Sequence, residues 1–122
     1  MGVINKIKKD LAFSVDTNTF TQTAAIIEKV DLFITNDSSL MHTAAAMKRD
    51  VIAIIGPTNK NYIYPWETNY EIASLELECS PCFFYSPRPL TCSRTDIQFK
   101  CIKELNVDTV YNKALQMLQK TN

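Results

Sequence analysis

Apolar and polar positions around the centre of the chain follow the order strand, helix, strand. Residues 31–35 contain three consecutive large apolar side chains and predict a buried strand. Leucine, methionine and alanine then recur at helical spacing until the charged residues 48–50 end the pattern. A second apolar run, 51–55, predicts another strand. Because the 15 residues 36–50 are too many for a hairpin and enough for a crossover, we expect the two strands to be parallel.

The rest of the pattern predicts a small α/β fold. Its further elements are a short helix over 3–10, a brief strand over 11–15, a turn and helix cap over 16–19, a helix over 20–30, an edge strand over 70–77, a helix over 96–105 and a final helix capped by Asn106 or Asp108. The side chains expected to face the core of the two longer helices are Ala24, Ala25, Ile27, Val110, Ala114, Leu115 and Leu118. The prediction is one Rossmann-like parallel sheet with flanking helices over residues 1–122.

The junction between the first strand of this central unit and its helix has the composition of a phosphate site. Asn36 and Asp37 end the strand, and Asp37 is the predicted N-cap of the helix. Ser38, Ser39 and Leu40 then fall in the first turn, where backbone N–H groups lack intrahelical acceptors. A diphosphate can accept hydrogen bonds from these groups and gain from the helix dipole.

Two further features place ligand-binding groups at the same edge of the sheet. Residues Gly56, Pro57 and Thr58 follow the second strand directly, and carboxyl ends of neighbouring parallel strands form the usual ligand edge. His42 lies four positions after Ser38, so it shares a helix face with the hydroxyls. A lone histidine is more often a structural hydrogen-bonding group than a ligand, and the sequence pattern alone leaves both roles open.

Composition narrows the range of partners. Thirteen basic and thirteen acidic residues balance to zero, so the chain lacks the basic excess of a nucleic-acid-binding protein. It contains only two glycines, which excludes a glycine-rich P-loop or a G-x-G-x-x-G dinucleotide loop. Neither a signal peptide nor a transmembrane run is evident. These observations favour a small ligand over nucleic acid as the partner. They also predict that the chain has no transmembrane segment.

Four motifs in the same order resemble glycosyltransferase family 9, the lipopolysaccharide heptosyltransferases and their relatives. They lie at residues 35–46, 51–58, 65–66 and 79–83. The resemblance implies the C-terminal half of a GT-B fold, in which an N-terminal domain binds the acceptor and a C-terminal domain binds the nucleotide-sugar donor. We therefore expect a fragment of a larger two-domain enzyme, because 122 residues suffice for one domain only.

The resemblance also implies an activity. It is the transfer, with inversion, of a sugar from a nucleotide-diphosphate sugar, of which ADP-heptose is the suggested example, to a lipopolysaccharide core acceptor. No cofactor or metal is implied, and the general base is expected in the missing N-terminal domain, so the fragment alone is expected to be inactive. The implied location is cytoplasmic, or peripheral on the inner face of the inner membrane, and the fragment's bare domain surface favours self-association. The alternative is a non-catalytic nucleotide-binding or interaction module of the same fold.

The resemblance assigns roles within the first motif and shows one departure. The family pattern D-[ST]-G-x-x-H places a donor-binding role on Asp37 and His42. The family usually has glycine where this chain has Ser39, which crowds the closest backbone approach to the diphosphate but adds a hydroxyl donor. A serine-hydrolase triad of Asp37, Ser38 and His42 is disfavoured, because triad members normally converge from separate elements.

Four cysteines lie in the predicted loop over 79–101. Cys79, Cys82, Cys92 and Cys101 have the spacing C-x2-C-x9-C-x8-C, and four thiolates can form a tetrahedral zinc site. The second pair is not a C-x-x-C, and Cys101 lies in a predicted helix. We rank structural thiols first, zinc second and an adventitious disulfide third, since thiols stay reduced in the cytosol. No metal site is assigned.

Overall fold

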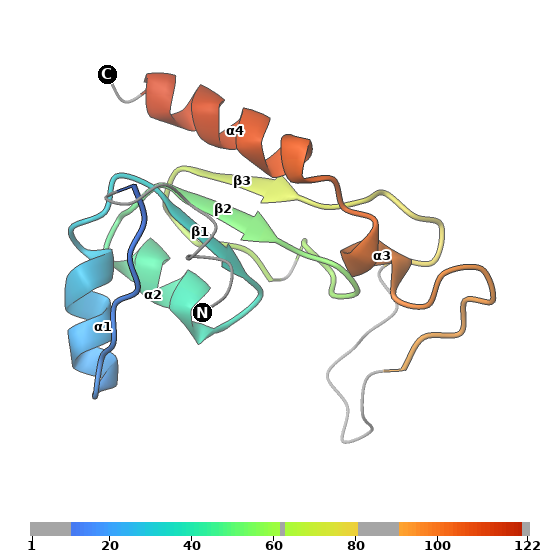
Figure 1. Ribbon diagram of the computed structural model, residues 1–122, viewed down its shortest axis with the longest axis horizontal. Helices are drawn as coiled ribbons and strands as arrows, with labels where there is room; N and C mark the ends of the chain where they lie inside the picture. The colour runs from blue at the N-terminus through green and yellow to red at the C-terminus, as the bar shows by residue number, and fades with distance from the viewer. Residues whose placement is uncertain (1–10, 62, 81–90, 121–122) are drawn as a thin grey trace.

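A three-stranded parallel sheet forms the centre of the protein (Figure 1). The structure, a computed structural model, describes residues 11–61, 63–80 and 91–120. In chain order its elements are α1 (Phe20–Ile27), β1 (Phe33–Asn36), α2 (Ser39–Ala46), β2 (Val51–Ile54), β3 (Tyr70–Ala73), α3 (Lys100–Lys103) and α4 (Val107–Lys120). The strand order is β1-β2-β3, so the predicted parallel pairing of the first two strands is confirmed.

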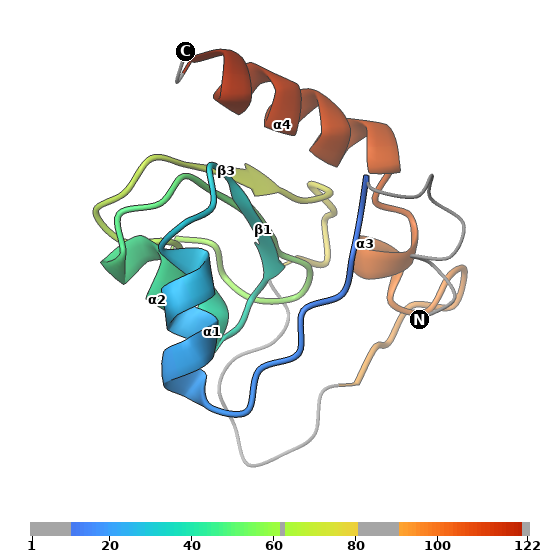
Figure 2. The same cartoon turned by 60° about the vertical axis from the view of Figure 1, so that its left-hand side comes forward.

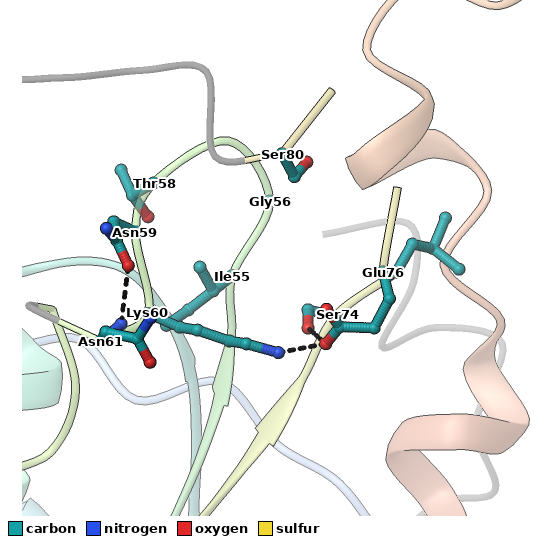
Figure 3. Close-up of a pocket in the computed structure, with 10 residues that line it drawn as sticks. Ile55, Gly56, Thr58, Asn59, Lys60, Asn61, Ser74, Glu76 and Ser80 are labelled. Carbon is teal, nitrogen blue, oxygen red and sulfur yellow. Dashed lines mark hydrogen bonds and ion pairs between the residues drawn. The ribbon is translucent and has the colours of Figure 1, made fainter. Parts of the chain in front are cut away.

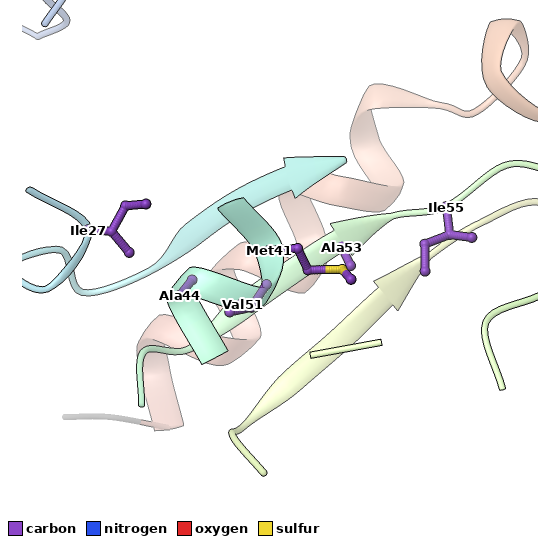
Figure 4. Packing of buried hydrophobic residues seen from close by; sticks show 6 residues of the cluster. All are labelled: Ile27, Met41, Ala44, Val51, Ala53 and Ile55. Carbon is purple, nitrogen blue, oxygen red and sulfur yellow. The ribbon is translucent and has the colours of Figure 1, made fainter. Parts of the chain in front are cut away.

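Strand β2 is buried on both faces. Val51, Ala53 and Ile55 project toward α1 and α2, where they pack with Ile27 and Met41 (Figure 4). The intervening residue Ile52 projects to the opposite face and packs under α4. Helices α1 and α2 therefore cover one face of the sheet and α4 covers the other, as the two views in Figures 1 and 2 show. A continuous apolar run is what a central parallel strand requires, because both of its faces are covered.

The register aligns the carboxyl ends of all three strands. Asn36 of β1 pairs with Ile54 of β2, and Ile54 pairs with Ala73 of β3. Each strand therefore releases its chain at the same edge of the sheet. This arrangement brings the segments that follow β1, β2 and β3 together, and it is the feature of the fold that creates a candidate site.

Helix α1 begins where the sequence predicts and ends earlier. The Thr19 side chain accepts a hydrogen bond from the backbone N–H of Gln22 at 3.2 Å, which confirms a cap within 16–19. The helix ends at Ile27 rather than at residue 30. Ala25, predicted to face the core, is exposed, because only Ala24 and Ile27 of this short helix are directed at the sheet side.

Helix α2 ends in a Schellman motif that uses lysine where glycine is usual. Lys48 has φ 57°, its N–H donates to the Ala45 carbonyl at 3.0 Å, and the Arg49 N–H donates to the Ala44 carbonyl at 3.0 Å. The Lys48 ammonium donates to the Glu67 carbonyl oxygen at 3.0 Å. This contact joins the turn after α2 to the segment before β3.

Two predictions outside the sheet are wrong and one lies beyond the described residues. Residues 11–15 form no strand, and Leu11 and Phe13 are exposed by 73% and 79%, so the apolar run has no neighbouring strand to pair with in the described chain. The helix predicted over 96–105 is confined to α3, where Phe99 with φ 58° interrupts helical geometry just before Lys100. The predicted helix over 3–10 lies outside the described residues.

Helix α4 has the predicted start but a rotated core face. The Asp108 N–H donates to Asn106 Oδ1 at 2.8 Å, which identifies Asn106 as the cap. Val110 and Ala114 pack on the sheet as predicted. The other two predicted core residues, Leu115 and Leu118, are exposed by 40% and 38%, whereas Met117, which the prediction omitted, is only 2% exposed. A helix that packs on a sheet through one narrow face leaves its flanking leucines at the margin.

Replacement of Met117 by alanine tests this assignment of the α4 core face. Met117→Ala is expected to lower the free energy of unfolding by about 2–5 kcal/mol, since it leaves a cavity against Ile52 and Ala73. The matched control Leu115→Ala truncates a partly exposed side chain and is expected to cost about 1 kcal/mol or less. Urea denaturation followed by circular dichroism measures both. A larger effect of Leu115→Ala would show that α4 packs through the face predicted from sequence.

Candidate functional site

The segment that leaves β1 opens helix α2 without a side-chain cap. The N-cap residue is Ser38, with extended φ −157° and ψ 171°, so the prediction that Asp37 is the N-cap is wrong. The Ser38 side chain makes no capping hydrogen bond, and no other side chain of the described residues accepts one from the first turn of α2. The backbone N–H groups of Ser39 and Leu40 are therefore left for an external acceptor, as the first amides of a helix have none inside it.

A contact with β1 explains why the Ser38 hydroxyl does not cap the helix. Ser38 Oγ lies 3.4 Å from Thr35 Oγ1, and Thr35 Oγ1 donates to the Asn36 carbonyl oxygen at 3.1 Å. Thr35 is the buried polar residue of the described core, at 9% exposure. The short hydroxyl chain holds Ser38 back toward the strand, so the N-terminal amides of α2 stay uncovered.

Asp37 and His42 are both accessible at this helix start. Asp37 is half-buried in the bend between β1 and α2, and its carboxylate makes no hydrogen bond or ion pair within the described residues. His42 is exposed one turn into α2, also without a hydrogen-bond partner there. Neither side chain is used by the fold of the described chain, which distinguishes both from Leu40, whose side chain packs against the core.

The second predicted segment, Gly56 to Thr58, follows β2 at the same edge but contacts different parts of the chain. A Cβ atom added to Gly56 lies 2.8 Å from Ile102 Cγ1 and 3.2 Å from Cys101 Sγ. The glycine therefore allows α3 to pack closely against the loop after β2. Pro57 and Thr58 are half-buried beside it.

A cavity of about 180 Å³ lies between the segments that follow β2 and β3 (Figure 3). Gly56 and Thr58 belong to its lining, as the sequence predicts for the ligand edge. The lining also contains polar residues that the prediction omitted: Asn59, Lys60, Asn61, Ser74, Glu76 and Ser80. Lys60 reaches across the cavity and forms an ion pair with Glu76, which lowers the pKa of the Glu76 carboxyl.

A second hollow, of about 380 Å³, lies along α2. Its lining joins His42 to Ala45 and Ala46 on the helix, to Lys48 in the turn after the helix, and to Trp66 in the segment after β2. Trp66 is 62% exposed. The predicted site residues are thus divided by the structure. Gly56 and Thr58 line the first cavity, His42 lines the second, and residues 36–40, at the start of α2, line neither.

The cysteine segment is organised by Arg94. Its guanidinium donates to both carboxylate oxygens of Asp96, at 2.9 and 2.8 Å, and also to Cys79 Sγ and Glu78, each at 3.2 Å. Asp96 in turn raises the pKa of Arg94, and Arg94 holds the pKa of Asp96 well below its usual range. These contacts join residues 78–79 to 94–96.

Two thiols of this segment accept hydrogen bonds. Cys92 Sγ accepts from the Phe99 N–H at 3.2 Å, and this bond lowers the pKa of the Cys92 thiol. Cys82 lies outside the described residues, and within the described ones no three potential ligands gather around a possible metal position. Cys101 lies in α3, so its predicted helical position is confirmed, and it is buried there.

Sequence comparison assigns the chain to a family. Residues 15–89 match the sequence profile described as glycosyltransferase family 9 (heptosyltransferase). The chain belongs to glycosyltransferase family 9. Among curated proteins, lipooligosaccharide heptosyltransferase 2 of Campylobacter jejuni subsp. jejuni serotype O:2 is 37% identical over 93 residues, which are 75% of this chain and 27% of that protein.

Two further relatives carry the same printed name. The protein from C. jejuni subsp. jejuni serotype O:6 is 35% identical over 88 residues, 71% of this chain and 26% of the relative. The one from Haemophilus influenzae is 50% identical over 44 residues, 31% of this chain and 13% of the relative. The chain spans about a quarter of the length of the two Campylobacter proteins that it matches. No solved structure gives a significant match.

Both candidate segments fall inside the part of the chain that matches family 9. The match includes the strand–helix–strand unit, the helix start at Ser38 and the loop after β2. It stops before Arg94 and α3. No helix among the described residues is long and apolar enough to cross a membrane.

Substitution of Gly56 tests its contact with α3. Gly56→Ala is expected to lower the free energy of unfolding by about 1–3 kcal/mol, because the added methyl group overlaps Ile102 and crowds Cys101. In an Ile102→Ala background the same substitution is expected to cost less, since the closest overlapping atom is gone. A double-mutant cycle by urea denaturation measures the difference. Equal costs in both backgrounds would refute a direct contact between Gly56 and Ile102.

Proposed function

We propose that this chain is the donor-binding part of an inverting glycosyltransferase, a Rossmann-like C-terminal half of a GT-B enzyme. The observation that carries the proposal is the uncapped start of α2 at the carboxyl end of β1, within the family 9 match. Two amides without an acceptor among the described residues and an exposed histidine there suit the diphosphate of a nucleotide-sugar. The proposed donor is ADP-heptose, and the proposed acceptor is a lipopolysaccharide core sugar.

The proposed chemistry follows from where charge develops. In an inverting transfer, the acceptor hydroxyl oxygen attacks the anomeric carbon while the bond from that carbon to the diphosphate oxygen breaks. Negative charge grows on the departing diphosphate, and the amides of Ser39 and Leu40 with the positive end of the α2 dipole stabilise it. His42 donates a further hydrogen bond from the same helix face. The base that removes the acceptor proton is assigned to a domain outside this chain.

Asp37 has a separate proposed role. A carboxylate repels a diphosphate, so Asp37 is suited instead to accept hydrogen bonds from hydroxyl groups of the donor. Its half-buried position in the bend, with no partner in the described chain, supports that role over helix capping. The Ser39 side chain, present where the family usually has glycine, is exposed at the helix start and adds a hydroxyl to the proposed phosphate site.

Nucleotide titration tests the donor site directly. ADP is expected to shift the backbone amide signals of residues 36–42 first, with those of Gly56 and Thr58 following. AMP, which lacks the second phosphate, is expected to shift them less at equal concentration. Two-dimensional 1H–15N NMR of the chain measures both titrations. If ADP shifts only signals from the cysteine segment while residues 36–42 remain unchanged, the proposed site is wrong.

Substitution of His42 separates binding from stability. His42→Ala is expected to weaken ADP binding about tenfold, the loss of one hydrogen bond to a charged group, without lowering the melting temperature. His42 is exposed and has no partner within the described residues. Thr21→Ala, at an exposed position of α1, serves as the control and is expected to leave ADP affinity unchanged. Normal ADP affinity combined with a much lower melting temperature would identify His42 as a packing residue.

A further inference from the structure

The cavity between the segments after β2 and β3 contains two hydroxyl groups that the fold leaves unsatisfied. Thr58 Oγ1 and Ser80 Oγ are buried and have no hydrogen-bond partner in the described part of the chain. They come from different segments, Thr58 after β2 and Ser80 beyond β3 (Figure 3). Buried polar groups without partners are rare because each costs free energy. Neither oxygen is open to solvent in its present rotamer, so a ligand in the cavity reaches it only after a rotation about χ1.

The charges that line this cavity cancel. Lys60 and Glu76 are joined by a hydrogen-bonded ion pair, and Ser74 Oγ donates to Glu76 Oε1 at 3.4 Å. Lys60 lowers the pKa of Glu76, so the carboxyl remains ionised near neutral pH. An anion that approaches Lys60 therefore also meets the negative charge of Glu76. A neutral ligand rich in hydroxyl groups can instead donate to the carboxylate and accept from the ammonium and amide groups.

Size and position limit the ligand further. The cavity volume of about 180 Å³ equals the liquid volume of about six water molecules, at about 30 Å³ each. It is smaller than sites for drug-sized ligands and suits a single ring. Neighbouring strands lie about 5 Å apart, so the cavity beside β2 and β3 is one or two strand spacings from the start of α2. A sugar attached to a diphosphate at α2 can span that separation.

We infer that this cavity binds one neutral sugar ring, whose hydroxyl groups form hydrogen bonds with Thr58 and Ser80. The inference rests on the donor-binding function proposed above. It divides the edge of the sheet into two subsites: the start of α2 for the charged diphosphate, and the charge-balanced cavity for the uncharged ring. The sugar of the donor and a sugar of the acceptor share this chemistry, and the experiment distinguishes them.

Three ligands separate the subsites by NMR. ADP is expected to shift amides of 36–42 and to leave Ser74, Glu76 and Ser80 unchanged. ADP-heptose is expected to shift the same amides and, in addition, those of Ser74, Glu76 and Ser80. A methyl heptoside without a nucleotide tests whether the ring belongs to the acceptor. The ring is assigned to the acceptor if this glycoside shifts the amides of residues 74–80 and ADP-heptose does not.

The outcomes distinguish the two proposals. ADP-heptose shifts confined to 36–42, with no effect of either sugar on residues 74–80, overturn the sugar subsite and leave the donor site intact. Absence of any nucleotide effect at 36–42 defeats the donor site, whereas a glycoside effect at 74–80 in the same protein still supports the cavity as a sugar subsite.

Two conservative substitutions test the hydroxyls themselves. Thr58→Val and Ser80→Ala remove the buried oxygen with little change of volume. Each is expected to leave the melting temperature unchanged or raise it, because an unsatisfied polar group is lost. Each is also expected to reduce the ratio of ADP-heptose affinity to ADP affinity about fivefold, the equivalent of one hydrogen bond. Thr21→Val, on the exposed side of α1, is the matched control and leaves the ratio unchanged.

The opposite combination overturns the inference. A lower melting temperature for Thr58→Val and Ser80→Ala, with an unchanged affinity ratio, assigns both hydroxyls to the fold. Inorganic phosphate provides the last comparison, because it is expected not to shift residues 74–80 of the unaltered chain. Glu76→Gln leaves Lys60 without its counter-charge and is expected to introduce phosphate shifts there. Phosphate binding in the cavity of the unaltered protein contradicts a neutral sugar subsite.

Discussion

Burial of β2 between two helical layers is the constraint on which the rest of the structure depends. Its residues alternate between two cores, with Val51 and Ala53 packed under α1 and α2 and Ile52 packed under α4. A strand buried on both faces needs a neighbour on each side to satisfy its backbone hydrogen bonds. Pairing with β1 and β3 in one register supplies them and fixes the three carboxyl ends at one edge. The candidate site follows from this register before any individual polar side chain is considered.

The central unit was predictable because apolar spacing alone determines it. A continuous run for β2, helical spacing for α2 and a crossover of sufficient length admit one parallel arrangement. Prediction failed where packing against distant elements decides the outcome. Periodicity in α4 allows several apolar faces, and only its position across β2 and β3 selects Met117 over Leu115 and Leu118. The apolar residues of 11–15 likewise have strand composition without a strand to pair with in the described chain.

The site was predicted in part, and its errors have local causes. Asp37 is of a residue type common at N-caps, but the helix begins one residue later, with Ser38 as its N-cap in contact with Thr35. The sequence did not predict the cavity residues that follow β3, because the predicted strand was too long. A predicted strand over 70–77 hides Ser74 and Glu76 within a sheet edge, whereas β3 ends at Ala73 and releases both toward the ligand edge. Strand ends are set by pairing partners, which a single sequence does not contain.

The two proposed subsites at the carboxyl edge of the sheet differ in charge, and this difference determines which part of the donor each one suits. A diphosphate requires unpaired donors and a positive potential, and the uncapped start of α2 provides both without a basic side chain. Lys60, the nearest cation of the cavity, is neutralised by Glu76 and so does not compete for the diphosphate. A free lysine in the cavity would draw the phosphates off the helix axis and displace the sugar. In the proposed arrangement the ion pair acts on specificity rather than on stability, since both groups are substantially exposed and such pairs stabilise a fold little.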